Sequence, residues 1–376
     1  MEEQFYQACS DGNIEEVRKL LQNSQIDINW QNQNAYLSTT SFYIACEKGR
    51  TEIVKLLLNV KRVDVNKADN KGRTPFYIAC EKGRTDIVKL LLNDNRVDIN
   101  KANVNGTTPF RIACEKELKA NKESPIYSDC EKGHIDIVKL LLNDERIDIN
   151  KGNTFYSACW KGHIEIVKLL LSDKRVDVNT ATDYGGWTPL YSACQKGHIE
   201  VVKLLLNDNR VDVNQTMNGG WTPLYSACQK GHTDIVKLLL NVKRVDVNKV
   251  DKYGKTPFYI ACKNGHIEIV KCLLASGREV DINKKGKYGK TGFDIVREIG
   301  NAANEGWESE EKFENRKRNC LMIVELIESF ERNQNETTRK LRIELGLDGK
   351  FIYLFIYLFI YFLLHRFFFF LTNLYL

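Results

Sequence analysis

Apolar and polar positions repeat along most of the chain with a period close to 34 residues. Within one period, residues 72–100, Phe76, Ala79 and Cys80 fall on one face of a short predicted helix. A second predicted helix is apolar on most of its circumference, at Ile87, Val88, Leu90, Leu91 and Leu92. A helix with so many apolar sides must pack between neighbours, and neither helix is long enough to be stable alone. The pattern therefore predicts a stack of two-helix repeats.

Both predicted helices have residues typical of helix boundaries at their ends. Thr74 is a good N-cap, and Pro75 suits the first helical position, where its missing N–H would be unpaired anyway. Gly83 is predicted to end the first helix. Asp86 lies in the first turn of the second helix, where a carboxylate interacts favourably with the helix dipole. Asn93 is predicted to end that helix in the left-handed conformation.

The same elements recur in register. Cysteines recur at intervals of 34 residues, at Cys46, Cys80 and Cys114 and again at Cys194, Cys228 and Cys262. The aspartate of a V-D-V-N element recurs in step, at Asp64, Asp98, Asp148, Asp177, Asp212, Asp246 and Asp281. We count nine repeats: a cap at residues 5–29, then repeats that begin near Thr40, Thr74, Thr108, Thr154, Thr188, Thr222, Thr256 and Thr291. In such an array each repeat packs only on its neighbours.

Residues 185–206 read GGWTPLYSACQKGHIEVVKLLL and resemble an ankyrin repeat, whose pattern is G-x-T-P-L-H-x-A-A-x-x-G-H-x-x-I-V-x-x-L-L. Tyr191 stands where the first histidine is usual, and Cys194 replaces the second alanine. The loop at 207–210 lacks the usual glycine. The resemblance covers roughly residues 4–330. It implies an all-α ankyrin-repeat solenoid of stacked helix-turn-helix units with hairpin loops, and a function in protein binding.

Breaks in the period suggest how the chain is organised. We expect an N-terminal capping repeat and loop at 1–39, central repeats at 40–283, a C-terminal capping repeat with an insertion at 284–332, a short helix or linker at 333–350, and a hydrophobic tail at 351–376. The repeat near 115–130 is irregular and carries an insertion at 117–127, where a local break in the concave surface is expected. The polar residues 301–319 are predicted to form a mobile insertion before a last helix at 320–330.

Composition narrows the function. With 43% hydrophobic and 28% charged residues, the chain is typical of a folded protein. The net charge of +6 is modest, so no nucleic-acid partner is expected. Eleven cysteines follow an acidic N-terminus without a secretory signal, which favours reduced thiols in the cytoplasm.

Histidines and cysteines occupy equivalent places in successive repeats. The histidines that begin the second helices are His134, His163, His198, His232 and His266. Stacked helices lie about 8–10 Å apart, which is too far for equivalent residues to share a zinc ion or form a disulfide. We therefore expect helix-end hydrogen bonds from the histidines and packing from the cysteines. No convergent nucleophile and base stand out, so no metal, cofactor or enzymatic activity is expected.

The resemblance also implies where partners bind, because partners of ankyrin repeats usually contact the loop tips and the exposed side of the first helix. The positions carried over to this chain are Arg73, Glu81, Lys82, Trp160, Lys161, Trp187, Gln195, Lys196, Trp221, Gln229, Lys230, Lys255 and Lys263. Trp187 and Trp221, extended by Trp160, suggest a mixed aromatic and basic patch for an acidic or amphipathic protein segment. The alternative is that each indole packs along its adjacent loop. The V-D-V-N asparagines, such as Asn66 and Asn214, resemble sites of asparagine hydroxylation in this family, with loop hydrogen bonding as the alternative.

The favoured function is a monomeric protein-interaction scaffold or adaptor. One alternative is a targeting subunit that presents substrates to a separate enzyme, such as a phosphatase or a ubiquitin ligase. This alternative needs a docking motif outside the repeats, and none is clear in 301–350. A third hypothesis, direct nucleic-acid binding, would require salt-sensitive association.

The tail at 351–376 is almost wholly apolar or aromatic, interrupted by His365 and Arg366. It is long enough to span a bilayer, and its many Phe, Ile and Leu residues outweigh one central arginine. The basic residues that precede it would keep the repeats in the cytosol. These observations suggest a tail anchor on a membrane. The alternative is translated low-complexity sequence, since the DNA repeat TTTA encodes the cycle F-I-Y-L that begins the tail.

Overall fold

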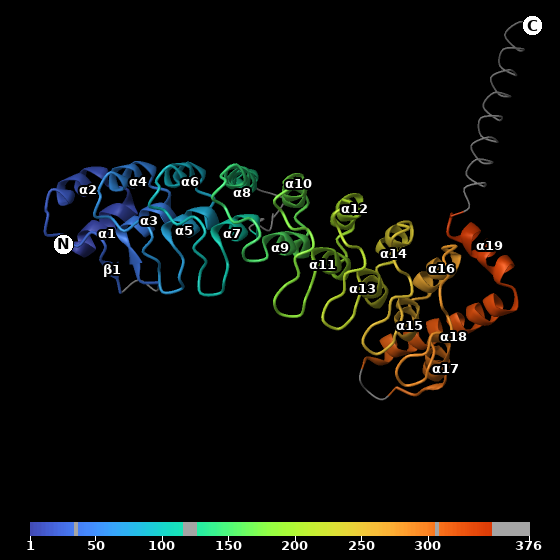
Figure 1. Cartoon of the computed structure of the whole chain (residues 1–376). Helices are drawn as coiled ribbons and strands as arrows, with labels where there is room; N and C mark the ends of the chain where they lie inside the picture. The colour runs from blue at the N-terminus through green and yellow to red at the C-terminus, as the bar shows by residue number, and fades with distance from the viewer. Residues whose placement is uncertain (34–36, 116–125, 305–307, 348–376) are drawn as a thin grey trace, which may run out of the picture. The chain divides into compact units, whose positions relative to one another are not determined.

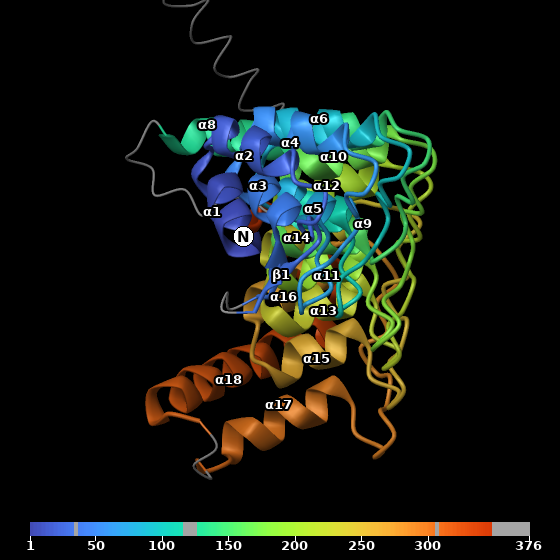
Figure 2. The same ribbon diagram turned by 90° about the vertical axis from the view of Figure 1, so that its left-hand side faces the viewer.

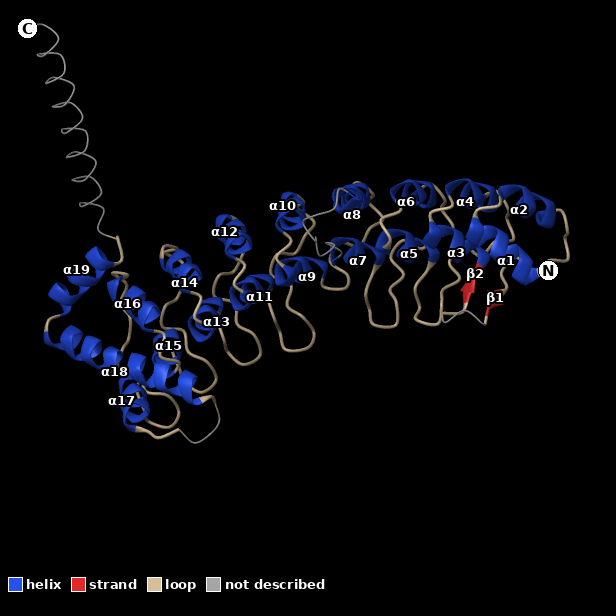
Figure 3. Cartoon of the chain, turned by 180° about the vertical axis from the view of Figure 1, so that it is seen from behind, coloured by secondary structure: helices blue, strands red, loops and turns tan. Residues whose placement is uncertain are grey.

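The computed structural model describes residues 1–33, 37–115, 126–304 and 308–347, and for residues 126–133 it describes the backbone alone. Within these ranges the chain forms nineteen helices and one short pair of strands (Figure 3). The fold is therefore all-α, as the periodicity predicts. The chain divides into two compact units, an N-terminal unit at Met1–Val211 and a C-terminal unit at Asp212–Leu376.

The N-terminal unit contains six helix pairs. The pairs are α1 (Glu2–Asp11) and α2 (Ile14–Leu21), α3 (Ser41–Lys48) and α4 (Thr51–Leu58), α5 (Pro75–Glu81) and α6 (Thr85–Leu92), α7 (Pro109–Glu115) and α8 (Ile126–Leu142), α9 (Thr154–Lys161) and α10 (Ile164–Ser172), and α11 (Pro189–Lys196) and α12 (Ile199–Asn207). Figure 1 shows the first helices of these pairs in one row and the second helices in another. Strands β1 (Gln31–Asn32) and β2 (Thr39–Thr40) pair antiparallel in the first loop. This arrangement is a stacked helix-turn-helix solenoid.

The C-terminal unit continues the pattern and then departs from it. It contains α13 (Pro223–Lys230), α14 (Thr233–Leu240), α15 (Pro257–Lys263), α16 (Ile267–Ala275), α17 (Gly292–Asn301), α18 (Glu310–Arg332) and α19 (Gln334–Glu344). Helices α13, α15 and α17 pack in succession, as do α14 and α16, while α18 packs on α17 and α16. Helix α19 has no counterpart in the other repeats and folds back onto α16.

Local chemistry sets the helix ends. The Thr74 hydroxyl accepts a hydrogen bond from the Tyr77 amide at 3.1 Å, so Thr74 is an N-cap as predicted. Gly83 follows the first helix with a φ of +68°, a conformation that favours glycine. The prediction for Asn93 was wrong, because its φ of −80° and ψ of −7° are right-handed. Its amide instead closes a last tight turn onto the Leu90 carbonyl at 3.2 Å.

The second helix α6 buries a narrower face than the sequence suggests. Ile87, Val88 and Leu91 of α6 are buried, but Leu90 and Leu92 remain partly exposed. The three buried side chains pack between neighbouring repeats, where each contributes about 1.5–3 kcal/mol through loss of contact with water. The stack therefore supplies the stability that an eight-residue helix lacks by itself.

The asparagines of the V-D-V-N elements join successive loops. The Asn66 amide group donates to the Arg96 carbonyl at 2.6 Å and accepts from the Asp98 amide at 2.8 Å. Asn214 does the same with the Arg244 carbonyl at 2.7 Å and the Asp246 amide at 2.7 Å. Figure 2 shows the loops that these bonds connect gathered along one side of the helices in the N-terminal unit. The structure thus gives these asparagines the loop hydrogen bonds expected as the alternative to modification.

The irregular repeat differs from expectation. Residues 116–125, which hold most of the insertion, lie outside the described residues. After them α8 runs unbroken from Ile126 to Leu142, through Gly133, instead of forming two short helices. Helix α7 packs directly against α9, so the row of first helices continues past the insertion. The expected break is therefore absent from the described part of that row.

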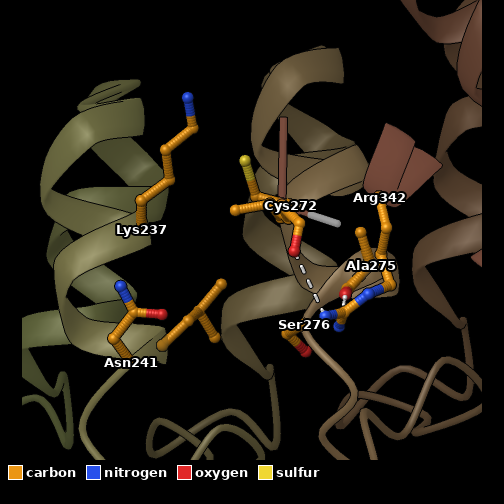
Figure 4. Close-up of a pocket in the computed structure, with 8 residues that line it drawn as sticks. Lys237, Asn241, Cys272, Ala275, Ser276 and Arg342 are labelled. Atoms are coloured by element: carbon orange, nitrogen blue, oxygen red, sulfur yellow. Dashed lines mark hydrogen bonds between the residues drawn. The ribbon is translucent and has the colours of Figure 1, made fainter. Parts of the chain in front are cut away.

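The end of the C-terminal unit also corrects the sequence prediction. Helix α18 begins at Glu310, so residues 310–319 are helical and extend the helix predicted at 320–330. Helix α19 occupies much of the segment predicted as a short helix or linker. The Arg342 guanidinium donates to the Ala275 carbonyl at the end of α16 at 3.2 Å (Figure 4). Lys271 and Glu344 form an ion pair at 2.6 Å beside it. Helix α19 therefore covers α16 where a further repeat would otherwise pack.

A pocket of about 180 Å³ remains between α14, α16 and the end of α19, lined by Lys237, Cys272 and Arg342 (Figure 4). None of the helices in the described ranges is both long and apolar enough to cross a membrane. The hydrophobic tail at 351–376 lies outside those ranges.

Candidate protein-binding surface

The histidines link each repeat to the repeat before it. His198 Nε2 lies 2.9 Å from the Trp160 carbonyl oxygen, and His266 Nε2 lies 3.3 Å from the Gln229 carbonyl oxygen. In the early repeats arginine takes this place, since Arg84 Nε donates to the Glu47 carbonyl at 3.1 Å. These side chains satisfy carbonyl groups at the ends of first helices, which have no partner within their own helix. The helix-end role predicted for the histidines is confirmed at these positions.

The cysteines described by the structure are buried and carry free thiols. Burial raises the pKa of the Cys272 thiol to about 11 and that of Cys320 to about 11. A thiol with a raised pKa is a poor nucleophile, because the thiolate is the reactive form. The cysteines therefore act in packing, as the sequence predicts.

Three aromatic side chains from two adjacent repeats stack in the N-terminal unit. The ring centroids of Tyr156 and Trp160 lie 6.1 Å apart with an interplanar angle of 27°. Those of Trp160 and Trp187 lie 5.6 Å apart at 10°. The Lys196 ammonium group lies 3.8 Å from the centroid of the Trp160 ring, within range of a cation–π interaction. We call Tyr156, Trp160, Trp187 and Lys196 the aromatic surface.

Contacts with the surrounding residues hold the side chains of the aromatic surface in place. Tyr156 and Trp160 are one helical turn apart on α9, so their side chains leave the same face of that helix. His198, from the next repeat, contacts the Trp160 carbonyl oxygen. Trp187 lies immediately before the N-cap Thr188, and its indole packs against the loop at Gly185. These contacts fix the orientation of both tryptophans before a partner binds. Both side chains remain partly exposed and are therefore accessible to a partner.

Trp221 belongs to the C-terminal unit and has a different environment. Its ring stacks on Tyr225 with centroids 5.8 Å apart at 5°, and its indole packs against the loop at Gly219. This is the loop packing that was considered as the alternative for these indoles. The structure gives no basis for joining Trp221 to the aromatic surface.

Two predicted binding residues of the third repeat are engaged with each other. Arg73 pairs with Asp69 at 2.7 Å and with Glu81 at 3.2 Å, and its side chain is only 15% exposed. Burial opposes the charge of Arg73, but the hydrogen bond to Asp69 and the nearby negative groups leave its pKa raised. Lys82 lies 3.7 Å from Glu47. Arg73 and Glu81 engage each other within their own repeat, and the Lys82–Glu47 pair reaches the preceding repeat, so Arg73 and Glu81 are poorly placed to contact a partner.

The remaining predicted residues vary in exposure. Lys161, Lys230 and Lys263 are exposed, whereas Gln195, Gln229 and Lys255 are partly exposed. The Gln229 carbonyl accepts a hydrogen bond from the Asn264 side chain at 2.9 Å. Lys255 lies over Tyr253 and Tyr259, with its ammonium group 5.3 Å and 5.7 Å from the ring centroids. Their role in binding stays a prediction.

Sequence reasoning missed two features. The first is Tyr156, whose spacing of four residues from Trp160 was the available signal. The second is a bridge between repeats: Tyr43 donates to Asp69 at 3.1 Å, and Tyr225 donates to Asp251 at 3.2 Å. Tyr43 and Tyr225 stand where the ankyrin pattern usually has histidine, so the substitution carries a structural role of its own.

Comparison with known families agrees with this geometry. The family of ankyrin repeats matches the chain in overlapping segments, at residues 5–103, 42–122, 102–182, 130–217, 176–251 and 209–286. The chain therefore belongs to the ankyrin-repeat family. Ankyrin repeats are generally protein–protein interaction modules, and proteins of the family are typically scaffolds without enzymatic activity. A search of curated proteins found no significant match.

Proposed function

We propose that the chain is an interaction scaffold and that its aromatic surface is a contact for a partner protein. The observation that carries the proposal is the stack of Tyr156, Trp160 and Trp187 with Lys196 over it. Partly exposed tryptophans in a rigid setting are the residues in which binding energy concentrates. Rigid rings also lose little conformational entropy when a partner binds.

The chemistry of the surface indicates the kind of partner. The rings offer apolar area, the Lys196 ammonium group lies over Trp160, and the exposed Lys161 follows Trp160 in α9. A segment that places an aromatic or large aliphatic side chain against the indoles and a carboxylate near a lysine would match both features. This makes the surface suited to an amphipathic protein segment with acidic residues.

The test is a peptide-display selection on the intact chain. Peptides enriched on the wild type are expected to bind the Trp160→Ala/Trp187→Ala variant at least about tenfold more weakly, because truncating such residues typically costs more than 1 kcal/mol each. Tyr184→Ala is the matched control, since Tyr184 is 93% exposed on a loop of the same repeat and lies outside the stack. Equal affinity of the double variant, with wild-type helicity by circular dichroism, would exclude the aromatic surface as the site.

We further propose that residues 351–376 hold the scaffold on a membrane with the repeats in the cytoplasm. The support is compositional: the tail is long and apolar enough to span a bilayer and follows the basic residues Arg339, Lys340, Arg342 and Lys350. After carbonate extraction of cells, the full-length protein is expected in the membrane pellet, and a form ending at Gly349 in the supernatant. Recovery of both forms in the supernatant would favour translated low-complexity sequence.

A further inference from the structure

Two loops of the C-terminal unit are unusually rich in lysine. The loop before α15, residues 249–255, reads KVDKYGK, and the loop before α17, residues 284–290, reads KKGKYGK. We call these two segments the lysine loops; their lysines are Lys249, Lys252, Lys255, Lys284, Lys285, Lys287 and Lys290. The equivalent loop before α13, residues 215–221, reads QTMNGGW and has no charged residue. The loop before α5, residues 67–73, reads KADNKGR and carries the same net charge of +2 as residues 249–255, so residues 284–290, at +4, hold the strongest excess of positive charge among these four loops.

The lysine loops touch each other through their backbones. The Lys287 amide donates to the Tyr253 carbonyl at 2.7 Å. A Cβ atom placed on Gly254 would lie only 3.5 Å from the Gly286 Cα atom. The ammonium groups of both loops are thus brought onto one continuous surface, with Tyr288 standing 75% exposed among them.

The surface has little counter-charge of its own. Its one acid, Asp251, is only 5% exposed and accepts hydrogen bonds from the Tyr225 hydroxyl and from the amides of Tyr253 and Lys255. Lys290 forms an ion pair with Glu298 at 2.7 Å. Within the described part of the chain, the exposed Lys284, Lys285 and Lys287 have no ion pair.

Several lysines of the second helices are neutralised locally. On the second helices an acid three residues earlier pairs with the lysine: Glu52 with Lys55 at 2.6 Å, Glu165 with Lys168 at 2.7 Å and Glu200 with Lys203 at 2.7 Å. The contrast shows that this repeat can balance its cations and that the lysine loops leave theirs unbalanced.

We propose that the lysine loops bind a short acidic segment of a partner protein. Like charges gathered with few counter-ions raise the energy of the free surface, and an anionic ligand lowers it. The exposed Tyr288 adds an aromatic contact of the kind enriched at protein interfaces. The surface spans two adjacent repeats, roughly 10 Å, the length of three or four extended residues. Phosphates lie about 3.4 Å apart along each strand of a duplex, so a surface of roughly 10 Å would meet only about three on one strand, and it suits a compact acidic cluster better than a nucleic acid.

The test uses fluorescence anisotropy with the intact chain and a fluorescein-labelled peptide containing six consecutive glutamates. The wild type is expected to bind this peptide at low ionic strength and to lose affinity as salt is added. Replacing Lys284, Lys285 and Lys287 with glutamine is expected to weaken binding roughly tenfold, since each exposed charge pair contributes about 0.2–1 kcal/mol. The matched control replaces Lys139, Lys168 and Lys203 with glutamine, which changes the net charge equally, and it is expected to bind within about twofold of the wild type.

Two further arms separate the alternatives. The Trp160→Ala/Trp187→Ala variant is expected to bind the glutamate peptide like the wild type. Binding by the lysine loops is therefore tested independently of binding by the aromatic surface. Equal loss of affinity in both glutamine variants would show general charge attraction and overturn the proposal. If single-stranded DNA or phosphatidylserine vesicles bind more tightly than the glutamate peptide, and do so through Lys284, Lys285 and Lys287, the proposed acidic protein segment is wrong and that ligand is the one that the surface binds.

Discussion

Replacing Gly162 with alanine is expected to lower the free energy of unfolding by about 2–4 kcal/mol. Gly162 ends α9 with a φ of +80°, where a Cβ atom costs about 1–2 kcal/mol. The same Cβ would lie 2.6 Å from His198 Nδ1 and would push the ring away from the Trp160 carbonyl. Losing that hydrogen bond adds about 0.5–1.5 kcal/mol. Chemical denaturation followed by circular dichroism measures the change.

A substitution at Gly106 separates the cost of the positive φ from the cost of the contact with His198. Gly106 also has a positive φ, +74°, but a Cβ atom added there would meet no other atom of the described residues within 4 Å. Gly106→Ala is therefore expected to cost only about 1–2 kcal/mol. In a double-mutant cycle, Gly162→Ala should cost correspondingly less when His198 is already alanine. Equal costs for Gly162→Ala and Gly106→Ala would show that the contact with His198 is unimportant.

Replacing Asn214 with alanine is expected to lower the free energy of unfolding of the C-terminal unit by about 1–3 kcal/mol. The substitution removes the hydrogen bonds to the Arg244 carbonyl and from the Asp246 amide, each of which contributes about 0.5–1.5 kcal/mol. Because these bonds join two repeats, their loss weakens the interface on which a repeat array depends. Hydrogen exchange of the 244–248 amides is expected to accelerate together with the loss of stability.

Asn283 provides the control at the same position of the motif. It is exposed, and its side chain has no hydrogen bond in the described part of the chain, because the last repeat, α17 and α18, has no V-D-V-N loop after its second helix. Asn283→Ala is therefore expected to change stability by less than about 0.5 kcal/mol. A similar cost for both variants would mean that the asparagine acts within its own loop and does not join repeats.

Features that depend on local sequence were predictable. Thr74 caps its helix and Gly83 ends it because each acts on residues a few positions away. Asn93 was misjudged, since a tight turn onto Leu90 ends the helix without a left-handed residue. Helix α8 runs through Gly133, at the position of the glycine that ends the first helix in regular repeats, so the repeat pattern did not predict its unbroken length. The period identifies the family, whereas an irregular repeat needs its tertiary neighbours to be known.

The sequence predicted which repeats contribute residues to the candidate site but not how those side chains contact one another. Equivalent positions in adjacent repeats placed Trp160 near Trp187, but ring stacking depends on side-chain rotamers that the pattern does not specify. The sequence also grouped Trp221 with them; Trp221 stacks on Tyr225 in the C-terminal unit, and its place in a shared patch stays a prediction. Arg73 looked accessible, yet its neighbours Asp69 and Glu81 engage it. The sequence pattern did not specify which charged side chains pair with each other, either within this repeat or in the Lys82–Glu47 contact with the preceding one.

Binding of a partner through the aromatic surface is tested most directly by one affinity comparison. The dissociation constant of a selected peptide is measured for the wild type, for Trp160→Ala/Trp187→Ala and for Trp160→Phe/Trp187→Phe. The alanine form is expected to bind at least about tenfold more weakly, and the phenylalanine form, which keeps a ring at both positions, within about threefold of the wild type. Equal dissociation constants for the wild type and the alanine form, at equal helicity, would contradict a role for the aromatic surface in binding.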